Sequence, residues 1–436
     1  MVLEYERLNT QQKILIVTYY WPPSGGSGVQ RWMYFAKYLK QLGWEPIVVT
    51  VDEEKASYAV LDTSLNQEVD NIRVIKTNTR EPLQWYSFLT SGSRNKGIPQ
   101  GEVNRTSIFR KFAAYIRGNF FIPDARKGWV PFALKAARKI IIEEKITQII
   151  TTGPPHSTHL VGLQLQQEFD LNWLVDFRDP WSDLFYNKVL YRSQRTIKKD
   201  LYLETQVLRT ASGVLTTIGG KLHEDLKLKA PLQNLYALPN GYDAELMQSV
   251  EAKPIQDVFH VVYTGLLTHN QPYDTVLKVL NSISTPVPIR LSLAGTISPE
   301  IRSEIQAEYP KIEVVYHGYL SHKDAIGLMK SAHLLLNFIF LGAQTQMISG
   351  KLLEYIATEI PILSIGNPDS EAGCFLKQGT AATMLDEKNT NAILDFIQIA
   401  VTQKDSIRNT FPQLGEWSRE ALTLKLIFVF EGKTQV

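Results

Sequence analysis

Apolar and polar positions form alternating blocks along the first half of the chain. Residues 13–20 (KILIVTYY) are an almost continuous apolar run, as in a strand of a parallel sheet that is buried on both faces. After the loop WPPSGGSG, apolar residues recur at helical spacing until Gly43 ends the helix, and residues 45–51 are the next strand. The order of strand, helix and strand predicts a βαβ unit.

The same alternation continues to about residue 230. It predicts helices over residues 132–144, 157–169, 193–209 and 220–228, and strands over residues 146–152, 173–177 and 213–218. Pro, Asn and Gly then occur together in LPNGYD, and the periodicity is lost, as in a linker. We therefore expect a doubly wound α/β domain over residues 1–245.

The second half of the chain starts the pattern afresh. Predicted strands cover residues 259–265, 289–295, 312–318, 333–339 and 361–365, and predicted helices end near 283, begin at 299 and cover 321–331, 351–358 and 391–401. A second Rossmann-like α/β domain is thus expected over residues 246–415. Two such domains joined by a short linker face a cleft at the carboxyl ends of their strands, where ligands of such sheets bind.

Composition and charge exclude several classes of protein. The 436 residues suffice for two or three domains, and 44% hydrophobic residues with a net charge of +2 exclude a disordered chain and disfavour a nucleic-acid binder. The single cysteine, Cys374, excludes a disulfide scaffold and suits a reducing compartment. A polar, acidic start and the lack of an apolar run of ~20 residues predict no signal peptide, no membrane span and a cytoplasmic location.

The near-neutral total conceals a basic segment. Residues 94–145 contain 12 Lys plus Arg against 4 Asp plus Glu, a local net charge of +8. Within residues 105–120, one helical face carries Phe109, Phe112, Ile116 and Phe120, with Arg110 and Arg117 beside it. The pattern predicts either a peripheral contact with an anionic membrane or a helix that packs on its own domain with solvated arginines.

A glycine loop joins the first strand to the first helix. Gly26 and Gly28 leave backbone N–H groups open to a phosphate, a carboxylate or an acceptor group of the substrate. The dinucleotide-binding fingerprint fails because Arg31 occupies the place of its third glycine, which disfavours a dehydrogenase. The alternative is a flexible turn without a ligand.

Two further motifs follow strands of the first domain. In GPPHSTH, His156 is expected at the mouth of the sheet, where it can donate to a sugar hydroxyl or carry a proton, and His159 on the helix surface. In DFRDPWSD, Arg178 can pair with a phosphate, and Asp179 is either a catalytic carboxylate or an N-cap before Pro180. No carboxylate stands at ligand spacing from the histidines, so no metal site is predicted.

The segment SGKLLEYIATEIPIL is the most informative. A helix that begins after Ser349 at Gly350 presents free N–H groups, and Lys351 places a cation at the wrong end of the helix dipole unless an anion such as a diphosphate binds there. Glu354 lies on the same helix face and can accept from two vicinal hydroxyls of a ribose. Diphosphate followed by ribose predicts a nucleotide site; the alternative is a solvated Lys/Glu pair.

Two other strands of the second half end in glycine. Gly265 allows close approach of a phosphate to the backbone, and Tyr319 and Leu320 are candidates to pack against a base. Each signal alone is weak, because glycine after a strand is ordinary turn chemistry.

Seven segments occur in an order typical of one family: YYWPPSGGSGVQR, TTGPPHSTHLVG, VDFRDPW, LPNGYD, YTG, HGYL and GKLLEYIATEIPIL. With them the chain resembles retaining glycosyltransferases of the GT-B fold, in the bacterial family 4-like group, over nearly its whole length. The resemblance implies a nucleotide-sugar donor in the C-terminal domain, an acceptor in the N-terminal domain, and no metal or other cofactor. It also implies that residues 416–436 form a helix that crosses back to the N-terminal domain.

The chain departs from the family pattern at two places. Glu354 matches the second glutamate of the family's E-x7-E motif, the ribose contact, but Gln346 stands where the first glutamate would be. The usual basic pair after the YTG strand is also missing, with Leu266 and His269 nearby. Lys351 is then the main cation expected to meet the diphosphate.

Together these features predict a glycosyltransferase, cytoplasmic or at the inner face of the membrane, that builds a surface polysaccharide or glycolipid on a lipid-linked or saccharide acceptor. In this hypothesis Lys351 stabilises the departing diphosphate, Glu354 holds the ribose, His156 orients the donor sugar or the acceptor hydroxyl, and Asp179 is a further catalytic candidate. Two alternatives remain: a sugar-nucleotide epimerase of the same architecture, and an inactive nucleotide-sugar binding protein, suggested by Gln346.

Overall fold

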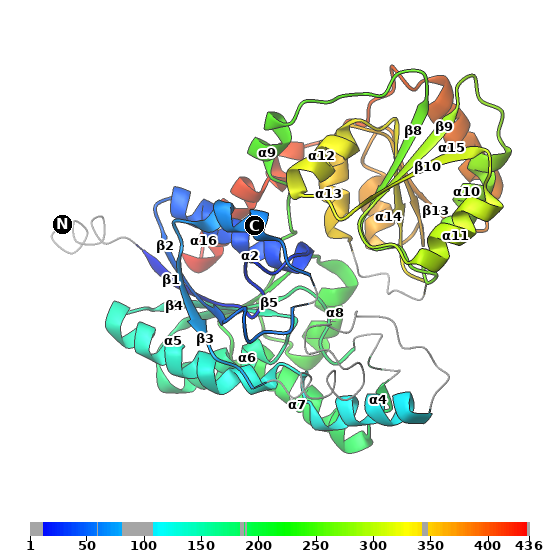
Figure 1. Cartoon of the computed structure of the whole chain (residues 1–436). Coiled ribbons are helices and arrows are strands. Elements are labelled where there is room, and N and C mark those ends of the chain that lie inside the picture. Colours follow the sequence, from blue (N-terminus) through cyan, green and yellow to red (C-terminus); the bar gives the residue numbers. More distant parts are fainter. Residues whose placement is uncertain are drawn as a thin grey trace. The chain divides into compact units, whose positions relative to one another are not determined.

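The computed structural model describes residues 12–58, 60–80, 108–183, 187, 190–341 and 348–433. The chain folds into two compact units (Figure 1): unit 1 comprises Met1–Pro239 with Thr423–Val436, and unit 2 comprises Asn240–Leu422. The division falls just before the expected boundary at residue 245, because the LPNGYD segment is held from both sides. The Leu238 N–H donates to the Thr216 carbonyl in unit 1, and the Tyr242 N–H donates to the Trp417 carbonyl in unit 2.

Unit 1 is built on a seven-stranded sheet in the order β3-β2-β1-β4-β5-β6-β7, with all neighbours parallel. Its strands are β1 (Lys13–Val17), β2 (Glu45–Val51), β3 (Arg73–Thr77), β4 (Gln148–Gly153), β5 (Asn172–Phe177), β6 (Gly213–Thr216) and β7 (Leu235–Ala237). Its α-helices are α2 (Ser27–Gln41), α4 (Ile108–Phe120), α5 (Val130–Glu144), α6 (Thr158–Glu168), α7 (Gln194–Thr210), α8 (Gly220–Lys229) and most of α16 (Arg419–Phe430).

Unit 2 contains a six-stranded parallel sheet in the order β10-β9-β8-β11-β12-β13. Its strands are β8 (Phe259–Thr264), β9 (Ile289–Ala294), β10 (Ile312–Gly318), β11 (Leu334–Phe338), β12 (Ile362–Ile365) and β13 (Ala382–Leu385). Its α-helices are α9 (Ala244–Ser249), α10 (Tyr273–Ser282), α11 (Pro299–Glu308), α12 (His322–Lys330), α13 (Gly350–Ala357), α14 (Glu371–Leu376) and α15 (Thr390–Thr402).

The two strand orders confirm the prediction of two doubly wound, Rossmann-like units. In each sheet the chain runs outward from the central strand, β1 or β8, and then returns to its other side with β4 or β11. The order therefore reverses between β1 and β4 and between β8 and β11. Open α/β sheets bind ligands beyond the carboxyl ends of the strands at such a reversal.

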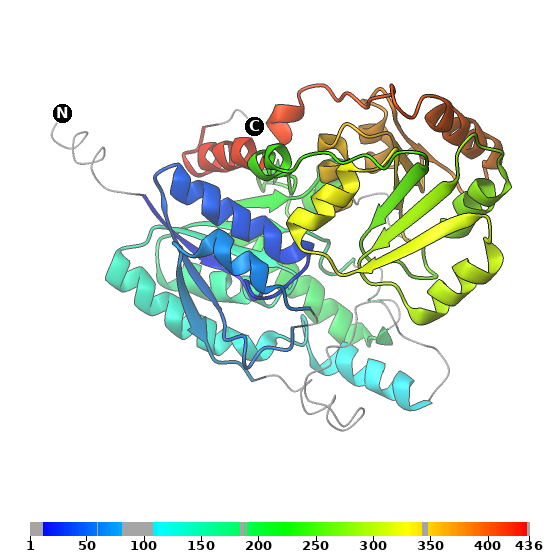
Figure 2. The same cartoon turned by 45° about the horizontal axis from the view of Figure 1, so that its top comes forward.

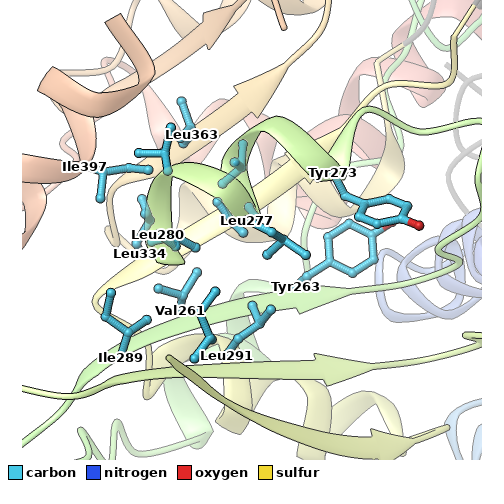
Figure 3. Packing of buried hydrophobic residues seen from close by; sticks show 14 of the residues in the cluster. Val261, Tyr263, Tyr273, Leu277, Leu280, Ile289, Leu291, Leu334, Leu363 and Ile397 are labelled. Atoms are coloured by element: carbon cyan, nitrogen blue, oxygen red, sulfur yellow. The ribbon is translucent and has the colours of Figure 1, made fainter. Parts of the chain in front are cut away.

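Both faces of the unit 2 sheet are buried, because neighbouring residues of a strand point to opposite faces. In β8, Val261 and Tyr263 pack in one hydrophobic cluster with α10 and α15, whereas Val262 packs in a second cluster with α12, α13 and α14. Figure 3 shows the first cluster, in which Leu277 and Leu280 of α10 meet residues of the sheet. This two-sided burial explains the continuous apolar runs of the sequence.

A buried ion pair ties α2 to β5 in unit 1. The Arg31 guanidinium donates to both carboxylate oxygens of Asp176 at 2.8–3.1 Å and to the carbonyls of Leu238 and Pro239, and neither charged side chain is exposed. Asp176 also accepts from Trp32 Nε1 and Thr152 Oγ1. The residue that replaces the third fingerprint glycine is thus a structural anchor of the sheet.

We expect Arg31→Met to lower the free energy of unfolding of unit 1 by about 3–5 kcal/mol, because Asp176 would keep a buried charge without its partner. Urea denaturation followed by tryptophan fluorescence measures this, since seven of the eight tryptophans fall within the residue ranges of unit 1. The control is Lys139→Met, which removes an exposed ion pair to Glu143 within unit 1 and should cost less than about 1 kcal/mol. Equal effects of the two variants would contradict the anchoring role.

The last helix, α16, begins in unit 2 and ends packed in unit 1. Near its end the Phe430 ring lies 5.9 Å from the ring of Trp44, and the Phe430 carbonyl accepts from Asn172 Nδ2 at 3.2 Å. The chain therefore crosses from one unit to the other within this helix, whereas the sequence placed the crossing segment at residues 416–436.

Candidate functional site

The N-terminal half of α13 is fixed to the end of β8, next to the strand-order reversal of unit 2. Lys351 Nζ donates to the Thr264 carbonyl at 2.9 Å. One turn later, the Tyr355 hydroxyl accepts from the Thr264 N–H at 2.9 Å. Two side chains of one helix face thus hold the same strand residue, which positions the start of α13 at the carboxyl edge of the sheet.

Lys351 occupies an unusual setting for a lysine. Its Nζ lies 3.8 Å from the centre of the Tyr263 ring, and burial lowers its pKa to about 7. Gly265 adjoins it: a Cβ on this glycine would lie 3.5 Å from Nζ, and the φ of +121° favours glycine. The ammonium form is thus destabilised by lost hydration, and a bound anion would favour that form.

The backbone N–H groups at the start of α13 lie next to Lys351 in the chain. Ser349 is the N-cap residue, but its side chain makes no capping hydrogen bond; its Oγ lies 3.5 Å from Asn337 Oδ1. Helix N-terminal N–H groups need partners from side chains, water or a ligand. The Gly350 terminus and Lys351 together therefore form a positively polarised end suited to a phosphate group.

Glu354 lies one turn further along α13, with its carboxylate held by Arg419 and by His322. Its Oε1 contacts His322 Nε2 at 2.7 Å and Arg419 Nη2 at 3.2 Å, and its side chain is 13% exposed. Burial raises the pKa of Glu354, but the charges and hydrogen bonds of His322 and Arg419 outweigh burial and hold that pKa below its ordinary value. Glu354 is therefore an ionised acceptor, and neither of these contacts uses Oε2.

The sequence did not indicate His322 or Arg419 as site residues. His322 is the first residue of α12, and Arg419 is the first residue of α16. They lie 32 and 65 positions from Glu354 in the chain, so no local spacing connects them. Tyr319, which is 52% exposed, and the partly buried Leu320 precede α12 and thus lie a few residues from His322.

The glycine loop of unit 1 is braced by Arg178. Its Nη1 donates to the Gly28 carbonyl at 2.6 Å, its Nε to the Gly153 carbonyl at 3.0 Å, and its Nη2 to the Pro154 carbonyl. A Cβ on Gly28 would lie 2.5 Å from Nη1, so a larger residue at this position would displace the guanidinium. Since its nitrogens already bind three carbonyls, we assign Arg178 a loop-holding role in place of the predicted phosphate contact.

Gly26 differs from Gly28. It is the N-cap residue of α2, with φ of 97°, and a Cβ there would meet nothing within 4 Å. The space before the α2 N-terminus is thus open on the side of Gly26, and the helix end has no side-chain cap. The loop keeps the features expected of an anion or acceptor contact.

His156 and His159 are both buried beneath this loop. The His156 ring stacks on Trp181 at 5.1 Å, and the His159 ring stacks on Phe177 at 4.9 Å. The prediction that His159 lies on the helix surface is wrong: it is fully buried and its Nδ1 bonds Thr151 Oγ1 at 2.9 Å. The side of α6 that carries His159 is packed, and a histidine can be buried there because its ring nitrogen has a hydrogen-bond partner.

Neither histidine is a cation in this environment. Burial, with the charges of His159 and Arg178, holds the pKa of His156 well below its ordinary value, and burial lowers the pKa of His159 to about 3. Both ring nitrogens of His156 are enclosed without a hydrogen bond of good geometry to the described residues. His156 is therefore neutral near pH 7 and its ring nitrogens are buried, which contradicts its predicted role as a proton carrier.

Asp179 does not cap a helix. It lies in a bend after β5, and no α-helix begins at Pro180, so the N-cap interpretation is wrong. Burial raises the pKa of its carboxyl above the ordinary value against the opposing charge of Arg178. The structure leaves Asp179 as a half-buried carboxyl next to Arg178 at the carboxyl edge of the sheet.

The predicted site residues therefore form two groups, one in each unit. In unit 2, Ser349, Gly350, Lys351 and Glu354 share the start of α13, with Gly265 beside Lys351. In unit 1, Gly28, Arg178 and the loop that contains His156 are brought together at the edge of the sheet. Gln346 lies outside the described residues. Among the described residues, no cluster of three or more His, Cys, Asp or Glu can hold a metal ion.

No helix in the described part of the chain is both long and apolar enough to cross a membrane. No protein-family model matches the chain, and no curated protein sequence matches it. Solved structures do. Sucrose-phosphate synthase from Thermosynechococcus elongatus matches with a TM-score of 0.62 and 16% identity, over 97% of this chain and 99% of that one.

Two other solved structures extend this likeness. The Anabaena protein HepE in complex with UDP and glucose matches with a TM-score of 0.59 and 11% identity, over 97% of this chain and 100% of that one. The lipopolysaccharide outer core galactosyltransferase WaaB matches with a TM-score of 0.56 and 11% identity over the same shares. The chain therefore has the GT-B fold, as its two Rossmann-like units predicted.

Proposed function

We propose that this protein is a glycosyltransferase that transfers a sugar from a nucleotide-diphosphate-sugar donor held by unit 2. The observation that carries the proposal is the face of α13, which has an uncapped helix start with Lys351 at one end and the ionised Glu354 one turn away. A ligand with a diphosphate next to a ribose would match this helix face. The structures of HepE with UDP and with UDP-glucose support this class of donor.

In the proposed reaction, the main contribution of the protein is to stabilise the departing diphosphate. As the bond from the sugar to the diphosphate breaks, negative charge grows on the leaving oxygen, and donors aimed at that charge lower the barrier. The α13 amides and Lys351 supply them without a metal ion. A leaving group stabilised on the face from which the acceptor attacks gives retention at the anomeric carbon.

Unit 1 supplies the acceptor side of the proposal. The open space at Gly26 and the uncapped α2 terminus suit a polar or anionic acceptor. The carboxyl of Asp179, whose pKa is raised by burial, is the unit 1 group that we propose exchanges a proton with an acceptor hydroxyl. The acceptor class that we propose is a saccharide or a lipid-linked saccharide, as in the synthesis of a surface polysaccharide or glycolipid.

Turnover of UDP-glucose tests the proposal. The protein is incubated with the donor and a panel of saccharide and lipid-linked acceptors; released UDP is quantified, and the anomeric configuration of the product is read by NMR. We expect UDP release that requires an acceptor, and an α-linked product from the α-linked donor. Other sugar nucleotides are run in parallel, so that the choice of base does not decide the result.

A second candidate function is epimerisation of a nucleotide sugar. It is favoured by the likeness to a Listeria monocytogenes protein described as a UDP-N-acetylglucosamine 2-epimerase, with a TM-score of 0.53 and 11% identity. An epimerised donor formed without any acceptor would support this function. Tight donor binding without turnover would instead support an inactive binding protein.

A further inference from the structure

The end of α4 and the start of α7 form one joined surface in unit 1. Asn119 of α4 accepts from the Ser193 N–H at 2.7 Å and from Thr196 Oγ1 at 2.8 Å, and its Nδ2 donates to the Tyr191 carbonyl at 3.1 Å. Both views of the molecule show α4 beside α7 (Figures 1 and 2). The two helices therefore present their outer faces together.

This α4–α7 surface is unusually apolar for an outer face. Six large apolar or aromatic side chains are between 40% and 64% exposed: Tyr115, Phe120, Tyr191, Ile197, Leu201 and Tyr202. Ile197 and Leu201 are one turn apart on α7. A helix of a globular protein normally turns such residues toward the core and leaves single apolar residues outside.

The charge of the surface has a single sign on the described helices. The exposed cations of this surface include Lys111, Arg195, Lys198 and Lys199. Lys127 is exposed as well, and its pKa is lowered first by partial burial and second by repulsion from the nearby Lys199. The two acidic residues of α7 face inward. Asp200 binds Arg192 and Trp181, and Glu204 binds Lys229.

A binding partner in solution would explain the lysines of this surface but not its exposed apolar side chains. Clustered lysines without acidic neighbours repel one another, which costs stability unless an anionic partner is present. A soluble polyanion would use the charges but would gain nothing from Phe120, Leu201 and Tyr202. A membrane surface uses both, because apolar and aromatic side chains enter the interface while lysines meet anionic headgroups.

We propose that the α4–α7 surface docks unit 1 onto a membrane that contains anionic lipid. The sequence pattern placed this contact on residues 105–120 alone. In the structure Phe120 is 64% exposed and Ala114 and Gly118 are buried, whereas the side chains of Phe109 and Phe112 lie outside the described ones. Among the described side chains, Ile197, Leu201 and Tyr202 of α7 belong to the surface as well. The proposal does not depend on the proposed function of unit 2.

Vesicle co-sedimentation of the full chain tests the proposal. Vesicles of phosphatidylcholine alone are compared with vesicles of phosphatidylcholine and phosphatidylglycerol. We expect binding to the anionic vesicles only, and binding that weakens as salt rises. The double variant Lys198→Glu/Lys199→Glu should weaken binding roughly 30-fold or more. Its matched control, Lys253→Glu/Lys388→Glu, makes the same charge change at exposed lysines of unit 2 and should bind like the original.

A second variant separates a membrane from a soluble polyanion. Phe120→Ser/Tyr202→Ser keeps every charge and should weaken vesicle binding without changing binding to heparin; its control, Ile142→Ser/Ile399→Ser, removes exposed apolar residues elsewhere. Thermal melts check that all variants fold. Vesicle binding that is absent, independent of anionic lipid, or unchanged in both double variants would overturn the proposal. Loss of heparin and vesicle binding only in the charge variant would overturn it in favour of a polyanion site.

Discussion

Replacing Glu354 with alanine is expected to remove about half or more of the stabilisation that saturating UDP gives this protein. A ligand at a hundred times its dissociation constant adds about 2.7 kcal/mol to the free energy of unfolding. Hydrogen bonds from ribose hydroxyls to an ionised carboxylate contribute about 1.5–3 kcal/mol, so their loss weakens binding by roughly ten- to a hundredfold. A thermal-shift titration of UDP against the original protein and the variant measures the difference.

Two controls make this result specific to the ribose contact. Glu308→Ala removes an exposed carboxylate of unit 2 that is remote from α13 in the sequence, and it should leave the UDP shift unchanged. Arg419→Met keeps the carboxylate but removes one of the two side-chain contacts of Oε1, so it should weaken UDP binding less than Glu354→Ala does. A UDP shift in Glu354→Ala as large as in the original protein would contradict the assignment.

The second large effect concerns Lys351 and pH. Because its pKa is about 7 in the unliganded protein, the amine loses its proton just above neutral pH, and UDP binds the charged form. UDP affinity should therefore fall as pH rises above 7, by up to about tenfold per pH unit while the bound form stays protonated. Lys351→Arg, which stays charged, should lose most of this dependence, and Lys351→Met should bind weakly at every pH.

The stability of the unliganded protein should change with pH in the opposite sense. The folded lysine titrates near 7 and the unfolded lysine near its ordinary value of 10.5, so the unfolded state binds more protons between those two values. This contribution to stability rises as pH increases through that window, and it disappears in Lys351→Met. Thermal melts of the two proteins without ligand measure it. A UDP affinity that is constant between pH 6 and pH 9 would contradict the role of Lys351.

Most of the architecture was predictable from the sequence because buried parallel strands leave a strong signal. β2 coincides with the predicted run at both ends, since it is a buried apolar segment bounded by turn residues. β3 gave no such signal because it is an edge strand with exposed and half-buried positions, as in RVIKT. β13 has only four residues, so its alternation of buried and half-buried positions is too short to predict a strand.

The site was predictable only where its residues share one element. Lys351 and Glu354 are three positions apart on α13, so their common face follows from helical spacing. The side chains that contact Glu354 come from α12 and α16, and the loop contacts of Arg178 come from segments around Gly28 and Gly153. Such contacts are made by tertiary packing, which no local pattern encodes.

The same limit explains the errors on His159 and Asp179. The spacing of His159 fits a helix surface, but α6 is covered on that side by Phe177 and Trp181 of the following strand and loop. Asp179 before Pro180 has the composition of a helix start, yet the chain bends there instead, and Trp181 is buried with its Nε1 on Asp200. Tertiary burial of an aromatic residue outweighed the local preference for a helix.

A crystal structure of the protein with UDP tests the central claim most directly. The account predicts the diphosphate at the Gly350 end of α13 within hydrogen-bond distance of Lys351 Nζ, with the ribose hydroxyls on the Glu354 carboxylate. UDP bound instead at the Gly26 loop of unit 1, with Lys351 and Glu354 making no contact to it, would contradict the account.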